Sequence, residues 1–113
     1  MNDYKIYAVD GDGTLWKNEW PGIGKPNKRL IRFCKRKQSK GHKLILWTCR
    51  CGDKLVEAVK WCEQQGLIFD EINDNIQEMN DLFGTNSRKV FASYYIDDKS
   101  IGFFKMLIWK YFR

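Results

Sequence analysis

The stretch YKIYAVDGDGTL (Tyr4–Leu15) joins a short apolar segment to two aspartates that lie two positions apart. Its first half, Tyr4–Val9, is rich in residues that favour β-structure, so it predicts a strand. Asp10 and Asp12 follow directly, with Gly11 between them. An acidic segment of this kind at the end of a strand has three interpretations: a calcium loop, a tight turn, or part of an active site.

The calcium interpretation fails on the residues further along. An EF-hand loop that began at Asp10 would need a glycine at its sixth position and a bidentate glutamate at its twelfth. The chain has Leu15 and Pro21 there. The stretch taken alone is also compatible with a simple surface turn, because Asp-Gly pairs are common in turns.

The rest of the chain alternates strands with helices. Lys43–Thr48 is a nearly continuous apolar run, which is typical of a strand buried on both faces of a sheet. Further strands are expected at Leu67–Ile72 and Phe91–Ile96. Helices are expected at Asn27–Lys40, capped by Asn27 and stopped by Gly41, and from an Asp53 cap to Gly66, with a last one in the aromatic stretch Ile101–Phe112.

Three further features complete this outline. Leu30, Ile31 and Cys34 would face the core. The interval from Leu15 to Asn27 is expected to be a loop, and the loop-rich interval from Asn73 to Lys89 has room for one short helix.

This order of elements predicts an α/β fold, a Rossmann-like three-layer sandwich around a mainly parallel sheet with right-handed crossovers. Neither the interval 15–27 nor the interval 73–89 is long enough to fold a cap domain. Because ligands of such sheets bind outside the carboxyl ends of the strands, the residues after each strand are the candidate site.

Length and composition predict one domain, residues 1–113, in an ordered protein of the cytoplasm that does not enter the membrane. The four cysteines are expected to be reduced thiols. They form no Cys-x-x-Cys pair that would suit a structural zinc site, and none begins the Cys-x5-Arg loop of cysteine-based phosphatases.

The charge is unevenly distributed. Lysine and arginine number 20 against 14 acidic residues, a formal net charge of +6. The surplus lies mostly in Lys28–Lys43, which contains no acidic residue. This stretch is either a solvated helix face or a surface for an anionic partner.

Polar and charged residues follow three of the expected strands. They are Asp10–Thr14, Thr48–Arg50 and the pair Asp97 and Asp98, with Lys89 shortly before the last strand. In a parallel sheet these segments converge on one edge. Clustered carboxylates raise one another's pKa unless a cation lies among them, and oxygen ligands of this kind suit Mg²⁺. The residues therefore predict a metal-assisted phosphate site.

The ordered set VDGDGTL, ILWTCR, a lysine and YYIDDK resembles the four motifs of the haloacid dehalogenase superfamily of aspartate-nucleophile phosphohydrolases. The resemblance covers roughly Tyr4 to Ser100. It implies that Asp10 attacks phosphorus and forms an aspartyl-phosphate, and that Asp12 serves as general acid and then as general base. The two side chains would point the same way if the segment is extended.

The resemblance also implies the remaining roles. Thr48 would hydrogen-bond a phosphoryl oxygen, and Lys89 would neutralise charge on the nucleophile. The implied Mg²⁺ ligands are Asp10, the backbone carbonyl of Asp12, Asp97 and Asp98; one of the last two binds directly and the other acts through water or the lysine, and the sequence does not distinguish them. The expected substrate contacts are Gly13, Thr14, Thr48, Cys49 and Arg50.

Several assignments stay open at the level of sequence. Arg88 competes with Lys89 for the role of the cation, and Thr48 could instead be satisfied by backbone. Arg50 could reach a second phosphate or the leaving group, as a comparable arginine does in polynucleotide kinase-phosphatases, or form a surface salt bridge. Gly11 departs from the family, which more often has a bulky residue there, and this glycine is expected to loosen the loop.

The function expected from these residues is Mg²⁺-dependent hydrolysis of a phosphomonoester. An open, capless site suits a macromolecular end, so the candidate substrates are a nucleic-acid end and a small phosphoester, with Trp16, Trp20 and Trp47 either stacking on a base or lying in the core. The alternative is a non-catalytic module that binds a partner through its basic helix or aromatic C-terminus. A receiver domain fits less well, and the C-terminal stretch is either core or part of a dimer contact.

Overall fold

The structure is a computed structural model of the chain and describes residues 3–100. The C-terminal helix expected within 101–112 lies outside these residues. The strands are β1 (Ile6–Val9), β2 (Trp16–Glu19), β3 (Gly22–Pro26), β4 (Lys43–Leu46), β5 (Glu71–Ile72) and β6 (Tyr94–Ile96). The helices are α1 (Lys28–Ser39), α2 (Gly52–Gln64) and α3 (Gln77–Phe83).

The predicted α/β fold is confirmed: β5, β4, β1 and β6 form, in that order, a parallel sheet. Tyr7 of β1 lies opposite Leu44 of β4 and Tyr94 of β6. All four residues of β1 are buried, which explains why its sequence is apolar without alternation. The described residues contain no cap domain.

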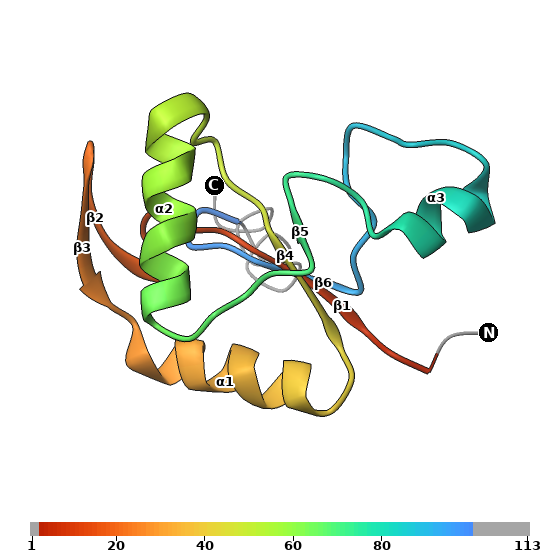
Figure 1. The fold of residues 1–113 in the computed structure, drawn as a ribbon, viewed down its shortest axis with the longest axis horizontal. Coiled ribbons are helices and arrows are strands. Elements are labelled where there is room, and N and C mark those ends of the chain that lie inside the picture. Colours follow the sequence, from red (N-terminus) through yellow and green to blue (C-terminus); the bar gives the residue numbers. More distant parts are fainter. Residues whose placement is uncertain (1–2, 101–113) are drawn as a thin grey trace, which may run out of the picture.

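Helices cover both faces of the sheet, which gives the three predicted layers (Figure 1). On one face, Tyr7 and Val9 pack with Ile31 and Cys34 of α1 and with residues of α2. On the other face, Ile6, Ala8 and Ile45 pack with Met79 of α3 and with Val90. The cysteines are free, and no helix within residues 3–100 is long and apolar enough to cross a membrane.

All four predicted strands are shorter than expected, and at the last two side chains replace backbone partners. At Leu67–Asp70 the Asp70 carboxylate accepts the Leu44 N–H at 2.7 Å, so regular pairing with β4 begins only at Glu71. At the start of the last predicted strand, Ser93 Oγ accepts the Ile6 N–H at 3.0 Å. The hydrophobic pattern indicates a strand at both places, but it does not show which polar group completes the edge.

The helix ends test the capping predictions. Asn27 caps α1 as predicted: its Oδ1 accepts the Leu30 N–H at 3.2 Å. The prediction that Asp53 caps α2 is wrong, because the helix begins at Gly52 and the cap position is Cys51. Asp53 lies in the first turn instead, where its charge interacts favourably with the helix dipole.

The interval expected to be a loop contains an antiparallel hairpin, β2–β3, which lies beside α2 (Figure 1). Lys17–Glu19 is exposed, so the hairpin lacks the apolar alternation that identifies a strand in sequence. Its turn is held by Arg50, which lies between β4 and α2 and is distant from the hairpin in the chain. This prediction failed because the stabilising contacts are distant in the chain.

Candidate functional site

Three of the predicted carboxylates meet at the carboxyl edge of the sheet. Asp10 follows β1, and Asp97 and Asp98 follow β6. Each offers an oxygen atom, and these atoms all lie within 4.8 Å of one another. The chain places later strands on one side of β1 until β6 pairs on its other side, so the cluster lies at the point where strand order reverses. Ligands of parallel sheets bind at this point.

The electrostatics of the cluster are those of a cation site. Burial, and after it the charge of Asp97, raises the pKa of Asp10 to about 6. Without a cation, the Asp10 carboxyl therefore loses its proton less readily beside Asp97 and Asp98. The donor set contains only carboxylate oxygens at this position, which fits a hard divalent cation such as Mg²⁺ and does not fit a soft metal that prefers sulfur.

The loop after β1 is shaped around this cluster. Thr14 is buried and donates its hydroxyl to Asp10 Oδ2 at 3.3 Å. Gly13 has a φ of +84°, and a Cβ at this position would collide with the Asp98 carboxylate. Only glycine satisfies both the backbone conformation and this close approach. Gly13 and Thr14 thus lie beside the acidic cluster, and their contact with a substrate stays a prediction.

Asp12 does not join the three clustered carboxylates. Its oxygens accept the Arg50 Nε and Nη2 groups at 2.8 Å each, and Trp16 Nε1 at 2.9 Å. The expectation that Asp10 and Asp12 point the same way assumed an extended segment. The backbone instead turns at Gly11, whose carbonyl accepts the N–H groups of Thr14 and Leu15. The hydrogen bonds from Arg50 lower the pKa of Asp12.

Arg50 is buried rather than part of a surface salt bridge. Besides Asp12, its guanidinium donates to the carbonyls of Pro21 at 3.3 Å and Gly22 at 2.8 Å. The same group lies 4.8 Å from the centre of the Trp20 ring. These contacts occupy Arg50 with the hairpin and Asp12, so in this conformation it is not available to a phosphate.

The position of Trp16 explains why residue 11 is a glycine rather than a bulky residue. A Cβ on Gly11 would lie 2.5 Å from the Trp16 ring, so no side chain fits there. The buried Trp16 ring packs edge-on against Trp61, with 5.0 Å between the ring centres. The loop is therefore packed tightly against the indole, contrary to the expected loosening. Trp16 belongs to the core, whereas Trp20 is 59% exposed.

Thr48 follows β4 at the same edge of the sheet. Its Oγ1 accepts the Arg50 N–H at 3.1 Å, which supports the interpretation that backbone satisfies it. The hydroxyl proton has no acceptor among residues 3–100, so it can still donate to a ligand. Asn73, which the sequence marked only as a loop residue, accepts the Thr48 N–H at 2.8 Å and has a φ of +53°. Cys49 is exposed.

Among residues 3–100, Lys89 makes no ion pair with the acidic cluster. Its side chain is exposed, and its Nζ is 5.1 Å from the centre of the Tyr95 ring. Neither Lys89 nor Arg88 forms an ion pair with Asp10 within the part of the chain that is described. The segment that follows Lys89 is ordered by Asn75, whose Oδ1 accepts the Phe91 N–H at 2.7 Å.

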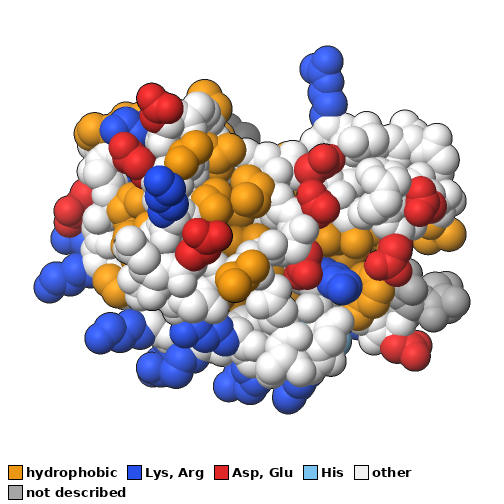
Figure 2. Space-filling view, in the orientation of Figure 1, with side chains coloured by type: hydrophobic (Ala, Val, Ile, Leu, Met, Phe, Trp, Pro, Cys, Tyr) orange, Lys and Arg blue, Asp and Glu red, His pale blue; other side chains and the backbone are white. Residues whose placement is uncertain are grey.

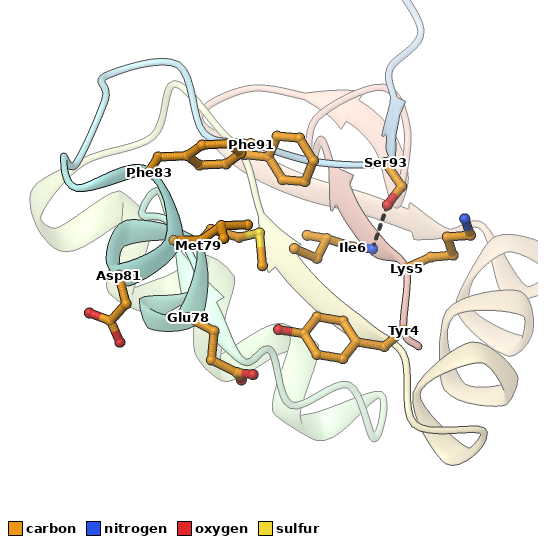
Figure 3. A pocket seen from close by; sticks show the side chains of 10 residues that line it. Tyr4, Lys5, Ile6, Glu78, Met79, Asp81, Phe83, Phe91 and Ser93 are labelled. Atoms are coloured by element: carbon orange, nitrogen blue, oxygen red, sulfur yellow. Dashed lines mark hydrogen bonds between the residues drawn. The ribbon is translucent and has the colours of Figure 1, made fainter. Parts of the chain in front are cut away.

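A cavity of about 570 Å³ opens at the opposite end of β1, beside α3 (Figure 3). Met79 and Ile6 face each other across it, and Phe83 and Phe91 lie along one side. Its charged lining is Lys5, Glu78 and Asp81. Within residues 3–100, only Asp10, Asp97 and Asp98 bring three carboxylates close enough to share a metal ion. The acidic cluster at the carboxyl edge is therefore the better candidate for phosphate chemistry.

No protein-family model matches the chain, and no curated protein matches it. Among solved structures, a conserved protein coded by a locus of Bacteroides thetaiotaomicron is similar, with a TM-score of 0.76 and 33% sequence identity. The alignment covers 96% of this chain and 93% of that chain. At this identity and coverage, the chain belongs to the same family as the conserved Bacteroides thetaiotaomicron protein.

Proposed function

We propose that the chain is a Mg²⁺-dependent phosphomonoester hydrolase in which Asp10 is the nucleophile. The observation that carries this proposal is the position of Asp10. Its carboxyl lies at the strand-reversal point, accepts the Thr14 hydroxyl, and is grouped with Asp97 and Asp98. Asp97, Asp98 and Asp10 would hold the cation, which when bound offsets negative charge on the carboxylates and the phosphoryl group.

The reaction proceeds in two displacements. An oxygen of ionised Asp10 attacks phosphorus, the bond to the substrate oxygen breaks, and the released alcohol takes up a proton. Water then attacks the aspartyl-phosphate, loses a proton, and releases inorganic phosphate with Asp10 restored. The Thr48 hydroxyl proton has no acceptor within residues 3–100, and Thr48 uses it to stabilise a phosphoryl oxygen.

Asp12 is the candidate for both proton transfers, because it is two residues from the nucleophile. In the conformation described, its bond to Arg50 keeps it ionised, which suits the base of the second step. Service as the acid of the first step requires the carboxylate to leave Arg50 and take up a proton. A weakly basic leaving group, such as an aryl oxide, needs this acid least.

A binding module without turnover is the second candidate. Two observations favour it: Arg50 holds Asp12 away from the acidic cluster, and Lys89 makes no ion pair with Asp10 within residues 3–100. Such a module would keep the cation site and bind a phosphorylated partner without cleaving it.

Hydrolysis of an aryl phosphate, with and without Mg²⁺, separates the two candidates. We expect Mg²⁺-dependent turnover by the parent and background rates for Asp10→Asn. The matched control is Asp81→Asn, which removes an exposed carboxylate from α3 and should turn over like the parent. Equal rates in the parent and Asp10→Asn, with both proteins folded by circular dichroism, would overturn the enzyme proposal.

A further inference from the structure

One side of α1 carries cations around an aromatic ring. Arg29, Phe33, Arg36 and Lys37 are spaced so that they share a flank of the helix. The Arg36 guanidinium lies 5.9 Å, and the Lys37 ammonium 5.4 Å, from the centre of the Phe33 ring. Figure 2 shows Lys and Arg side chains gathered along the edge of the molecule formed by α1.

This flank of α1 borders a groove against β6. One cavity, of about 320 Å³, is lined by Tyr7, Lys37 and Tyr94 among others. A second, of about 340 Å³, is lined by Arg29 and Asn27 among others. Phe33 and Ile96 line both cavities, so the two adjoin each other. We call them together the α1–β6 groove; no acidic side chain is among its described lining residues.

The groove leads to the acidic cluster. Ile96 immediately precedes Asp97. At the same end, Asn27 Nδ2 donates to the carbonyl of Thr14, within the loop that carries Asp10. From Arg29 to Lys37 the helix rises roughly 12 Å, the length of about three stacked nucleotides.

The groove also offers aromatic surface. The Tyr94 ring stacks on Tyr7, with 5.2 Å between centres and 22° between planes, yet Tyr94 remains 52% exposed. An exposed ring beside cations is the combination by which proteins bind single strands without reading sequence: bases stack on the ring and phosphates meet the cations.

We propose that the α1–β6 groove binds a single-stranded nucleic-acid end and directs its terminal phosphate to Asp10. This inference rests on the proposed function, whose substrate class it names. An anionic membrane would also meet the basic charge, but it would not use an exposed tyrosine ring on which bases can stack. A flat lipid surface would instead engage the cations of both flanks of α1 alike.

The test compares two charge-matched double variants of α1. Arg29→Gln with Lys37→Gln removes two cations that line the groove, and Arg32→Gln with Lys35→Gln removes two exposed cations from the other flank. Binding of a fluorescein-labelled 12-nucleotide single strand is followed by anisotropy at 50 and 200 mM salt. We expect parent binding to weaken steeply with salt, and the groove variant to lose about tenfold more affinity than the flank variant.

Substitutions at Tyr94 test the groove independently of its cations. Tyr94→Ala should weaken binding by about tenfold, because stacking is lost, and Tyr94→Phe should restore it. Against a 3′-phosphorylated and a 5′-phosphorylated single strand, kcat/KM relative to that for an aryl phosphate should fall in the groove variant and stay constant in the flank variant.

Each outcome bears on one proposal or the other. Equal effects of the groove and flank variants, or binding to phosphatidylserine vesicles without binding to the oligonucleotide, overturn the groove proposal. If the aryl phosphate is hydrolysed but the strand does not bind, the groove proposal fails and the enzyme proposal stands. If the strand binds through the groove but no phosphate is cleaved, the enzyme proposal fails and the groove is a binding surface alone.

Discussion

Asp10 carries a partly buried carboxyl that faces the carboxylates of Asp97 and Asp98. An aspartate in such a position is destabilising when ionised, and a bound cation removes the penalty. The Asp10 carboxylate must be ionised to attack phosphorus, yet it is the group whose pKa is raised. The proposed reaction therefore depends on a cation that favours its ionised form.

The raised pKa makes a prediction about stability without metal. Folded Asp10 titrates at about 6, against an ordinary value of about 4, so between these values the folded state holds more protons than the unfolded state. The Asp10 contribution to stability therefore falls as pH rises from about 4 to about 6. We expect Asp10→Asn, which cannot ionise, to be more stable than the parent by about 1 kcal/mol at pH 7 in EDTA.

Urea denaturation at pH 4 and pH 7 measures this difference. The advantage of Asp10→Asn over the parent should shrink towards pH 4, while Asp81→Asn shows no such trend. A variant that is less stable than the parent at pH 7 in EDTA would contradict the assigned electrostatics.

A substitution at Arg50 measures how much this buried cation stabilises Asp12 and the turn of the β2–β3 hairpin. Arg50→Met would leave Asp12 without its main partner and the Gly22 carbonyl without a donor. We expect a loss of about 2–4 kcal/mol in urea denaturation, because a partly buried charge is left unpaired. The control is Lys54→Met, which breaks an exposed pair with Glu57 at 3.5 Å and should cost at most about 0.5 kcal/mol. Similar losses in the two variants would contradict a structural role for Arg50.

At the scale of elements, α1 is tied to the site through its cap. Asn27 does two things with one amide: its Oδ1 caps Leu30 and its Nδ2 donates to the Thr14 carbonyl. The cap is visible in the sequence, whereas the second bond depends on the loop after β1 folding back to meet the helix. The first turn of α1 is therefore fixed relative to Asp10.

Two substitutions separate the functions of Asn27. Asn27→Ala should cost about 1–2 kcal/mol in thermal or urea denaturation, because both bonds are lost. Asn27→Asp keeps the acceptor for Leu30 and loses only the donor to Thr14, so it should recover part of that cost. Ser39→Ala, at the exposed far end of α1, serves as the control and should change stability by less than about 0.5 kcal/mol. If Asn27→Asp is as unstable as Asn27→Ala, the cap contributes little.

At the scale of the whole molecule, a cation that binds the folded chain and not the unfolded chain must raise its stability. The gain is RT ln(1 + [Mg²⁺]/Kd), about 2.7 kcal/mol at one hundred times Kd. We expect Tm to rise with Mg²⁺ in the parent and in Asp81→Asn, and the rise to be reduced in Asp98→Asn and Asp10→Asn. Equal rises in all four proteins, measured by calorimetry, would show that Mg²⁺ does not bind at this cluster.

Much of the fold follows from local pattern. The apolar runs at Tyr4–Val9 and Lys43–Thr48 predict buried parallel strands because a sheet covered on both faces has no polar side to alternate with. Asn27 and the glycines after the first two helices predict their ends from backbone chemistry alone. Strand ends then identify Asp10, Asp97 and Asp98 as neighbours, because parallel strands bring their carboxyl ends to one edge.

What the sequence alone determined is therefore the alternation of elements, the parallel sheet and the acidic edge, since each depends on hydrophobic periodicity and chain direction. Tertiary structure decided the β2–β3 hairpin, the pairing of Asp12 with Arg50, the fit of Gly11 to Trp16 and the position of the Lys89 ammonium over the Tyr95 ring. Each of these depends on side chains that meet across long stretches of chain or on a local turn, and neither spacing nor residue type specifies the direction in which such a side chain points.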